Sequence, residues 1–249
     1  MEALSIFKRN IKWRFQNPIT IVMTLVQPLI WLVVFSTLFA QSSVGNANYT
    51  AFIFPGILIM SVLSGAGISG IATYSNKANG SFYRMVISPT KRGSIVLGHA
   101  LDVTVLCFMQ SIMLSIIAFI MSVRIGTGII GLLLIILLLS AVIFFVAGIS
   151  YAMSMLIPDE NAFIAMINTI TLPMFFLSTA LLTREQAPAI FKVFISINPF
   201  TYAIDSFRNL INDYSVNWIR YGVAIGLFFT LSLIAFTIAK KSIKISSFS

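Results

Sequence analysis

Long apolar runs separated by short polar or basic segments make up most of the chain. Residues 15–76 contain no charged residue, and the polar stretch QSSVGNANYT at residues 41–50 divides them into two apolar segments. Four more apolar segments follow, at residues 95–123, 130–156, 161–183 and 221–239. Because a helix needs about 20 apolar residues to cross a bilayer, the pattern predicts an all-α membrane protein, with six transmembrane helices in one domain at residues 1–249.

The composition supports this class of protein. Hydrophobic residues make up 58% of the chain and charged residues 9%, with a mean hydropathy of +0.98, whereas soluble domains carry about 25% charged residues. The single cysteine, Cys107, lies in an apolar segment and excludes an intramolecular disulfide. The net charge of +9 comes from basic residues beside the apolar segments, which indicates membrane topology rather than a nucleic-acid partner.

The lysines and arginines predict the orientation, because cytoplasmic loops carry an excess of them. Six spans place both termini on one side. Eleven basic residues then fall on that side, namely Lys8, Arg9, Lys12, Arg14, Lys77, Arg84, Lys91, Arg92, Lys240, Lys241 and Lys244. Five fall on the other side, namely Arg124, Arg184, Lys192, Arg208 and Arg220. We therefore expect both termini and the loop at residues 77–92 to be cytoplasmic.

The segment before the first apolar run has an amphipathic pattern. In residues 1–17, apolar side chains recur at helical spacing between basic residues, at Leu4, Phe7, Ile11 and Phe15. The pattern predicts a helix lying in the membrane interface. The alternative is an ordinary basic flank with no further role.

Residues 184–215, between the last two apolar segments, predict two short helices. The first has an apolar side made of Ile190, Val193, Phe194 and Ile197. The second begins with Asn198 as N-cap and Pro199 at the first helical position. Its apolar face is formed by Phe200, Ala203, Ile204, Phe207 and Ile211, and its polar positions are Asp205, Arg208 and Asn209. Both helices are too short to cross a membrane, so we expect re-entrant helices that dip into the outer leaflet and are buried against the protein.

The loop FYRMVISPTKRG, at residues 82–93, predicts a short cytoplasmic helix. Ser81 is a suitable N-cap, and Ser88–Pro89 ends the helix. Phe82, Met85 and Val86 share one face. Such a helix suits docking into a groove of a partner protein; the alternative is a helix that rests on the lipid surface.

Residues for catalysis or metal binding are scarce. The stretch GSIVLGHA at residues 93–100 has the glycine spacing of a nucleotide-binding loop, but His99 and Ala100 stand where Lys and Ser or Thr are required. One histidine and one cysteine do not make a metal site, and no nucleophile–base pair is evident, so we expect no enzyme activity. Asp102 is either a proton or cation site or, as the sequence favours, a buried structural partner of His99 or of a nearby arginine.

Three stretches resemble the membrane (permease) subunits of type-2 ABC exporters. They are FIFPGILIM at residues 52–60, NGSFYRMVISPTKRG at residues 79–93 and NPFTYAIDSFRNL at residues 198–210, and the resemblance covers essentially the whole chain. It implies a multi-pass permease of a bacterial cytoplasmic (inner) membrane. Such a permease pairs with a second copy of itself or a related permease, and with two copies of a cytoplasmic ABC ATPase. ATP and Mg would be bound by that partner and no cofactor by this chain.

The resemblance also implies roles for particular residues. The cytoplasmic helix would couple to the ATPase through Ser81, Phe82, Tyr83, Arg84, Met85, Val86 and Ile87. An amphipathic substrate, such as a drug, antibiotic, lipid or peptide, would leave the cell along the first, second and fifth spans. Residues on that path would be Gln27, Ser61, Ser64, Gly65, Asn168, Thr169, Thr171, Phe175 and Phe176. One departure is the sequence YSNKANG, where relatives often have acidic residues before the coupling helix.

Two other classes of protein remain as alternatives. A secondary transporter or channel driven by an ion gradient would show several acidic residues or rings of charge inside the membrane, and this chain offers Asp102 alone. An intramembrane enzyme would need a nucleophile paired with a base.

Overall fold

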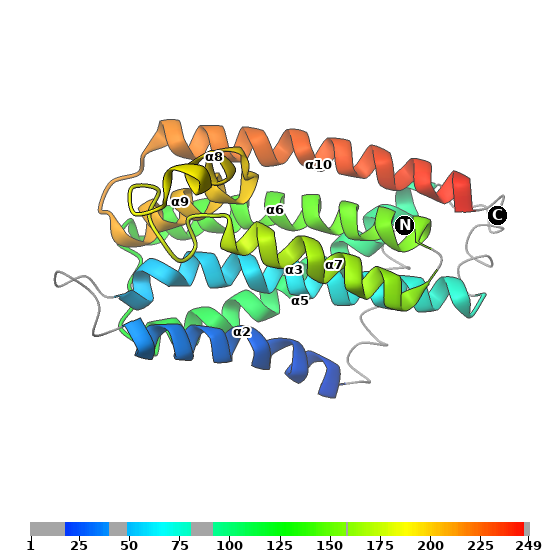
Figure 1. The fold of residues 1–249 in the computed structure, drawn as a ribbon, viewed down its shortest axis with the longest axis horizontal. Coiled ribbons are helices and arrows are strands. Elements are labelled where there is room, and N and C mark those ends of the chain that lie inside the picture. Colours follow the sequence, from blue (N-terminus) through cyan, green and yellow to red (C-terminus); the bar gives the residue numbers. More distant parts are fainter. Residues whose placement is uncertain (1–17, 40–48, 81–91, 158, 247–249) are drawn as a thin grey trace.

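The computed structural model describes residues 18–39, 49–80, 92–157 and 159–246. These residues form eight α-helices and no strand (Figure 1). The helices are α2 (Pro18–Phe39), α3 (Tyr49–Ala78), α5 (Arg92–Ile120), α6 (Gly128–Leu156), α7 (Glu160–Phe176), α8 (Ala189–Ile197), α9 (Pro199–Asn212) and α10 (Trp218–Ser246). The predicted all-α class is confirmed for these ranges. The predicted interfacial helix at residues 1–17 and the predicted helix at Ser81–Ile87 lie outside the described residues.

Four of the described helices are long and apolar enough to cross a membrane. They contain the stretches Tyr49–Lys77, Gly93–Ile120, Gly128–Leu156 and Trp218–Ile243. Helices α2 and α7 have 22 and 17 residues, and they run alongside these four helices (Figure 1). These four helices are therefore candidate membrane spans by length and composition, and the count of six spans stays a prediction.

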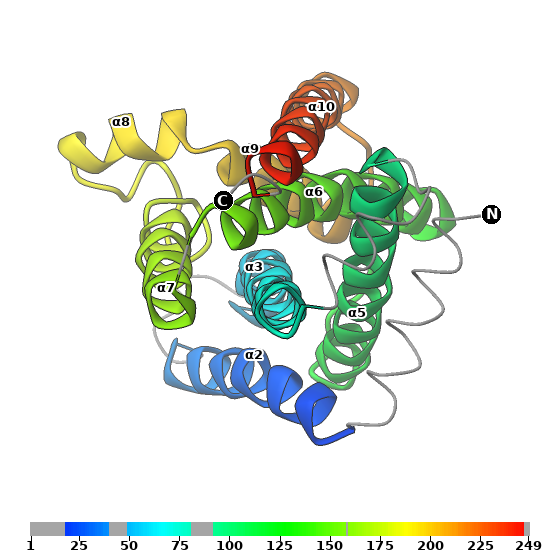
Figure 2. The same cartoon turned by 90° about the vertical axis from the view of Figure 1, so that its right-hand side faces the viewer.

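Helix α3 lies at the centre of the molecule. In the end view, α2, α5, α6 and α7 surround it, and α10 packs on the outer side of α6 (Figure 2). In the most apolar part of α3, 78% of the residues are buried, compared with 22% in α10. Small residues allow this close packing, because a Cβ atom added at Gly70 would collide with the side chains of Ser150 in α6 and Phe163 in α7.

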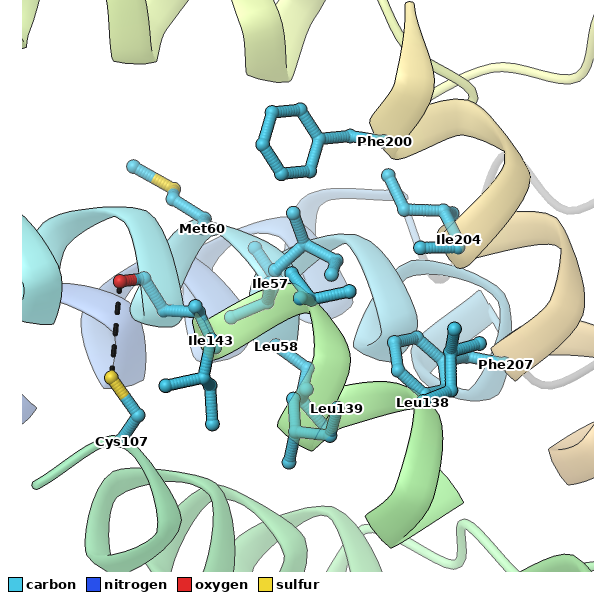
Figure 3. Packing of buried hydrophobic residues seen from close by; sticks show 14 of the residues in the cluster. Ile57, Leu58, Met60, Cys107, Leu138, Leu139, Ile143, Phe200, Ile204 and Phe207 are labelled. Carbon is cyan, nitrogen blue, oxygen red and sulfur yellow. Dashed lines mark hydrogen bonds between the residues drawn. The ribbon is translucent and has the colours of Figure 1, made fainter. Parts of the chain in front are cut away.

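The hydrophobic core gathers where α9 packs across α3 and α6. Ile57, Leu58 and Met60 of α3 and Leu138, Leu139 and Ile143 of α6 are drawn with Phe200, Ile204 and Phe207 of α9 (Figure 3). The Cys107 thiol on α5 donates to the carbonyl oxygen of Val62 at 3.9 Å. The apolar face predicted for α9 is therefore confirmed as a buried face.

A side chain at the start of α9 joins that helix to the end of α7. Asn198 is the N-cap of α9, as predicted, and its side-chain oxygen accepts from the Phe200 N–H at 3.0 Å. Its amide group donates to the carbonyl oxygens of Met174 at 2.7 Å and Leu177 at 2.9 Å. The helix predicted to continue to Thr183 ends at Phe176 instead, because Asn198 satisfies carbonyl groups that a longer helix would have bonded internally.

Helix α8 differs from its prediction. The apolar side predicted to be buried is exposed in the single chain, with exposed fractions of 73% for Ile190 and 74% for Ile197. Ile195 is the buried residue of this helix, and α8 lies outside the ring of longer helices (Figure 2). An apolar side chain is tolerated outside the protein core when lipid is the solvent, so the sequence pattern does not distinguish these two environments.

The packing of α6 against α10 yields a stability prediction. A Cβ atom added at Gly148 would lie 2.9 Å from the Ala235 Cβ atom, and overpacking of this kind costs about 1–3 kcal/mol. We expect Gly148→Val to lower the thermal unfolding midpoint of the detergent-purified chain. Gly226→Val is the matched control, because no heavy atom beyond the neighbouring backbone of its own helix lies within 4 Å of a Cβ atom added there. Equal midpoints for the two variants would contradict this account of the interface.

Candidate functional site: a groove between α2, α3 and α7

A groove with a volume of about 190 Å³ lies between α2, α3 and α7. On the α3 side, the lining residues recur at helical spacing, and they are Met60, Ser64, Gly67, Ile68 and Ile71. Its other walls are Gln27 of α2 and a face of α7 formed by Phe163, Ile164, Ile167, Asn168, Thr171 and Leu172. Most of the surface is apolar, with a few amide and hydroxyl groups, which is the usual chemistry of a site for an amphipathic small molecule.

Close contact between α3 and α7 forms one side of the groove. A Cβ atom at Gly67 would lie 2.9 Å from the Ile167 Cγ2 atom, so the glycine allows the two backbones to approach. One turn further along α3, the fully buried Phe163 side chain packs against Gly70. These two glycines therefore let α7 pack closely against α3 beside the groove.

The structure brings together four of the nine residues predicted for the substrate path. Gln27, Ser64, Asn168 and Thr171 all line the groove. Thr169 and Phe176 are exposed on α7 away from it. Ser61 is fully buried, Gly65 faces Cys107 and Gln110 of α5, and Phe175 belongs to the core. Contact of any of the nine with substrate stays a prediction.

The seven residues predicted to couple to a partner, Ser81–Ile87, lie outside the described residues, but the helices on either side of them are defined. Helix α3 ends at Ala78 and α5 begins at Arg92. The Lys77 ammonium group donates to the Met155 carbonyl oxygen at 2.8 Å. This bond joins the end of α3 to the end of α6.

Asp102 and His99 are buried and contact α3. Ser69 donates to the Asp102 carboxylate at 3.5 Å, and the Thr73 hydroxyl lies 3.1 Å from the Nδ1 atom of His99. The rings of His99 and Tyr151 are 5.0 Å apart. These contacts favour the structural interpretation of Asp102, with Ser69 of the facing helix α3 as its partner. None of these residues lines the groove between α2, α3 and α7.

Arg208 of α9 makes the most extensive polar contacts at the opposite end of α3. Its guanidinium group donates to the Phe52 carbonyl oxygen through two nitrogens, each at 3.2 Å, and to the Thr179 carbonyl oxygen at 2.6 Å. It also bonds to Asp205 at 3.4 Å and lies 3.8 Å from the centre of the Phe52 ring. Burial lowers the pKa of Arg208 to about 10 and Asp205 opposes the change, so the group remains charged at neutral pH.

Sequence reasoning missed the role of Arg208. Its spacing placed it with Asp205 among the polar positions of α9, yet the Arg208 side chain is 16% exposed and Asp205 accepts from the Thr179 hydroxyl at 2.6 Å. The two residues lie in two of the stretches on which the family resemblance rests, Phe52 in FIFPG and Arg208 in IDSFR. Nothing in their spacing showed that they touch.

Four helices among the described residues are long and apolar enough to cross a membrane, which is the pattern of a multi-pass membrane protein. Comparison with known proteins supplies the family. Residues 1–212 match the family model described as ABC-2 type transporter. This chain belongs to the ABC-2 type transporter family.

Several curated relatives carry the name "Putative transport permease ycf38". The chain is similar to the one from Cyanophora paradoxa, with 26% identity covering 92% of this chain and 84% of the relative. It is also similar to those from Pyropia yezoensis, at 29% identity covering 87% and 75%, and from Porphyra purpurea, at 30% identity covering 83% and 72%. The resemblance to ABC-2 permeases stated from the sequence motifs is therefore confirmed.

Arg208 provides a test of the contact between α9 and α3. Arg208→Met leaves the carbonyls of Phe52 and Thr179 without this donor and Asp205 without its cation. A buried polar group that loses its partner costs about 1–3 kcal/mol, so we expect a lower thermal unfolding midpoint of the purified chain. Arg208→Lys should recover only part of the lost stability, because an ammonium group cannot reproduce the planar set of donors of the guanidinium group. The control is Arg124→Met, since Arg124 is exposed; a comparable loss in that variant would argue against the contact.

Proposed function

We propose that this chain is the membrane subunit of an ATP-driven exporter, and that the groove between α2, α3 and α7 is one wall of the substrate path. The observation that carries the proposal is the meeting of Gln27, Ser64, Asn168 and Thr171 in one largely apolar groove. Apolar walls accept the hydrocarbon part of a drug, antibiotic, lipid or peptide. The amide and hydroxyl groups bond to its polar part.

The size of the groove supports a second chain on the other side of the path. Its volume of about 190 Å³ is below the range of about 300–1,000 Å³ that encloses a small ligand. A second copy of this chain, or a related permease, facing the groove would complete the enclosure. Opposed α2, α3 and α7 helices would then form a path along the dimer axis.

ATP would act through a separate cytoplasmic ABC ATPase, with two copies for each permease pair. The segment Ser81–Ile87 joins α3 to α5, and α3 supplies much of the groove wall. A displacement of this segment by the ATPase would therefore be transmitted to the groove through α3. The hydrogen bonds of Ser69 and Thr73 to α5 would make the two helices move together. ATP can drive such a change only if the ATPase binds the two arrangements with different affinities.

The same proposal assigns an orientation. The end of α3 that leads into the basic loop at residues 77–92 would face the cytoplasm, as would the C-terminal end of α10, which carries Lys240 and Lys241. The chain would cross the membrane six times, and both termini would be cytoplasmic. The re-entrant helices α8 and α9 would then lie on the outer side of a bacterial cytoplasmic membrane. The exposed apolar side of α8 would contact the outer leaflet.

Filling the groove should stop transport without removing the partner. We expect Ser64→Phe, which places an aromatic ring in the groove, to reduce ATP-dependent efflux of an amphipathic dye from vesicles containing the permease–ATPase complex to near background. Ser140→Phe is the matched control, because Ser140 is similarly half-buried but lies on α6 outside the groove. If Ser64→Phe transports at the wild-type rate, the groove is not the path.

Efflux driven by a proton or sodium gradient without ATP would instead favour the secondary-transporter alternative.

A second test concerns the coupling segment. We expect Arg84→Glu, or insertion of a glycine between Phe82 and Ile87, to reduce co-purification of a candidate ABC ATPase and to abolish the stimulation of ATP hydrolysis by substrate. Membrane insertion should be unaffected, because the apolar segments are unchanged. Arg124→Glu makes the same charge change in the predicted outer loop between α5 and α6 and should have no effect. Unchanged co-purification and hydrolysis in the Arg84 variant would place the ATPase contact elsewhere.

A further inference from the structure

A second and larger cavity lies at the end of the molecule that holds α8 and α9, away from the groove. It has a volume of about 630 Å³ and is formed by the turn after α7, the polar side of α9 and the first turn of α10. This volume falls within the range of small-molecule sites, about 300–1,000 Å³. Unlike the groove, the cavity is lined mainly by charged and polar side chains.

Charges of both signs face this cavity. The floor holds the ion pair of Arg208 with Asp205, in which the Asp205 side chain remains 33% exposed. The rim carries Arg184, Glu185 and Arg220, and none of these three has an ion-pair partner within 4.0 Å among the described residues. A third carboxylate, that of Asp213, also lines the cavity and accepts from the Asn209 amide. Guanidinium and carboxylate groups in one cavity match a ligand that bears an anion and a cation near each other.

An apolar surface continues from one side of the cavity along α10. Ile219 and Val223 line the cavity and are 82% and 51% exposed. Further along the same helix, Phe229 and Leu233 are also exposed. Tyr214 and Trp218, which are 94% and 64% exposed, lie at the start of α10, where aromatic residues mark the boundary between hydrocarbon and water. A ligand in the cavity would therefore have its polar part at the interface and an apolar route down α10.

We propose that this cavity binds the headgroup of a zwitterionic phospholipid that carries a primary amine, as in phosphatidylethanolamine. The phosphate would bond to Arg184 and Arg220, because guanidinium groups bind phosphate oxygens through paired hydrogen bonds. The ammonium group would lie near Asp205 and Glu185, and the acyl chains would run along the exposed side of α10. The site does not depend on the proposed export function, since it is separate from the groove and is tested on the permease alone.

The experiment measures lipid binding to the purified full-length chain by native mass spectrometry in detergent. Phosphatidylethanolamine, phosphatidylcholine and phosphatidylglycerol of equal chain length would be titrated, with soluble glycerophosphoethanolamine as the free headgroup. We expect phosphatidylethanolamine to bind most tightly of the three lipids, with an affinity at least tenfold higher than that of the free headgroup. The double variant Arg184→Gln/Arg220→Gln loses one or two charge-assisted hydrogen bonds to the phosphate. We therefore expect it to bind phosphatidylethanolamine about tenfold more weakly than the wild type does. Glu185→Gln should reduce the preference for phosphatidylethanolamine over phosphatidylcholine.

A matched control separates this site from general charge effects. The double variant Arg124→Gln/Lys192→Gln removes two exposed positive charges from the same predicted side of the membrane but outside the cavity, and its lipid binding should match wild type. Equal binding of the three lipids, or equal weakening in the two double variants, would overturn the proposal. Equal affinity for the free headgroup and the lipid would overturn the assignment to a membrane lipid.

Discussion

Hydrogen bonds from two side chains to main-chain carbonyl groups join α9 to the end of α7, to the turn that follows α7 and to α3. Helix α7 ends at Phe176, and unpaired carbonyl groups are costly in apolar surroundings. Asn198 bonds to the carbonyls of Met174 and Leu177, and Arg208 bonds to those of Phe52 and Thr179. These bonds allow the chain to leave α7, form α8 on the outside and return through α9 into the core.

The position of α3 connects this region to the rest of the molecule. Its first turn lies beneath Arg208, its middle forms a wall of the groove, and its far half bonds to α5 through Ser69 and Thr73. The segment that joins it to α5 is the one proposed to contact the ATPase. A central helix that packs against α2, α5, α6 and α7 would transmit displacement, because tightly packed interiors deform little. This arrangement would give a physical basis for the proposed coupling between the ATPase and the groove.

The groove and the charged cavity differ in chemistry and place. The groove has few polar groups and lies along α3, so its recognition of ligands would be permissive, as the proposed export of amphipathic compounds would require. The cavity carries guanidinium and carboxylate groups beside the exposed side of α10, and such groups select a ligand by its charges. A lipid held there would touch the turn after α7, α9 and α10 together. It would thus stabilise the same region that Asn198 and Arg208 hold from within.

The sequence by itself determined the class of protein, the apolar segments, the cap at Asn198 and the buried face of α9, because these depend on composition and on local periodicity. Three motifs were also enough to identify the family. Only the tertiary structure decided that α7 stops at Phe176, that the apolar side of α8 is exposed, that Gly65 faces α5 while Ser64 faces the groove, and that Arg208 contacts Phe52. The physical reason is that in a membrane protein both lipid and neighbouring helices accept apolar residues. Hydrophobic pattern therefore predicts that a helix is embedded, but not which of its faces meets which neighbour.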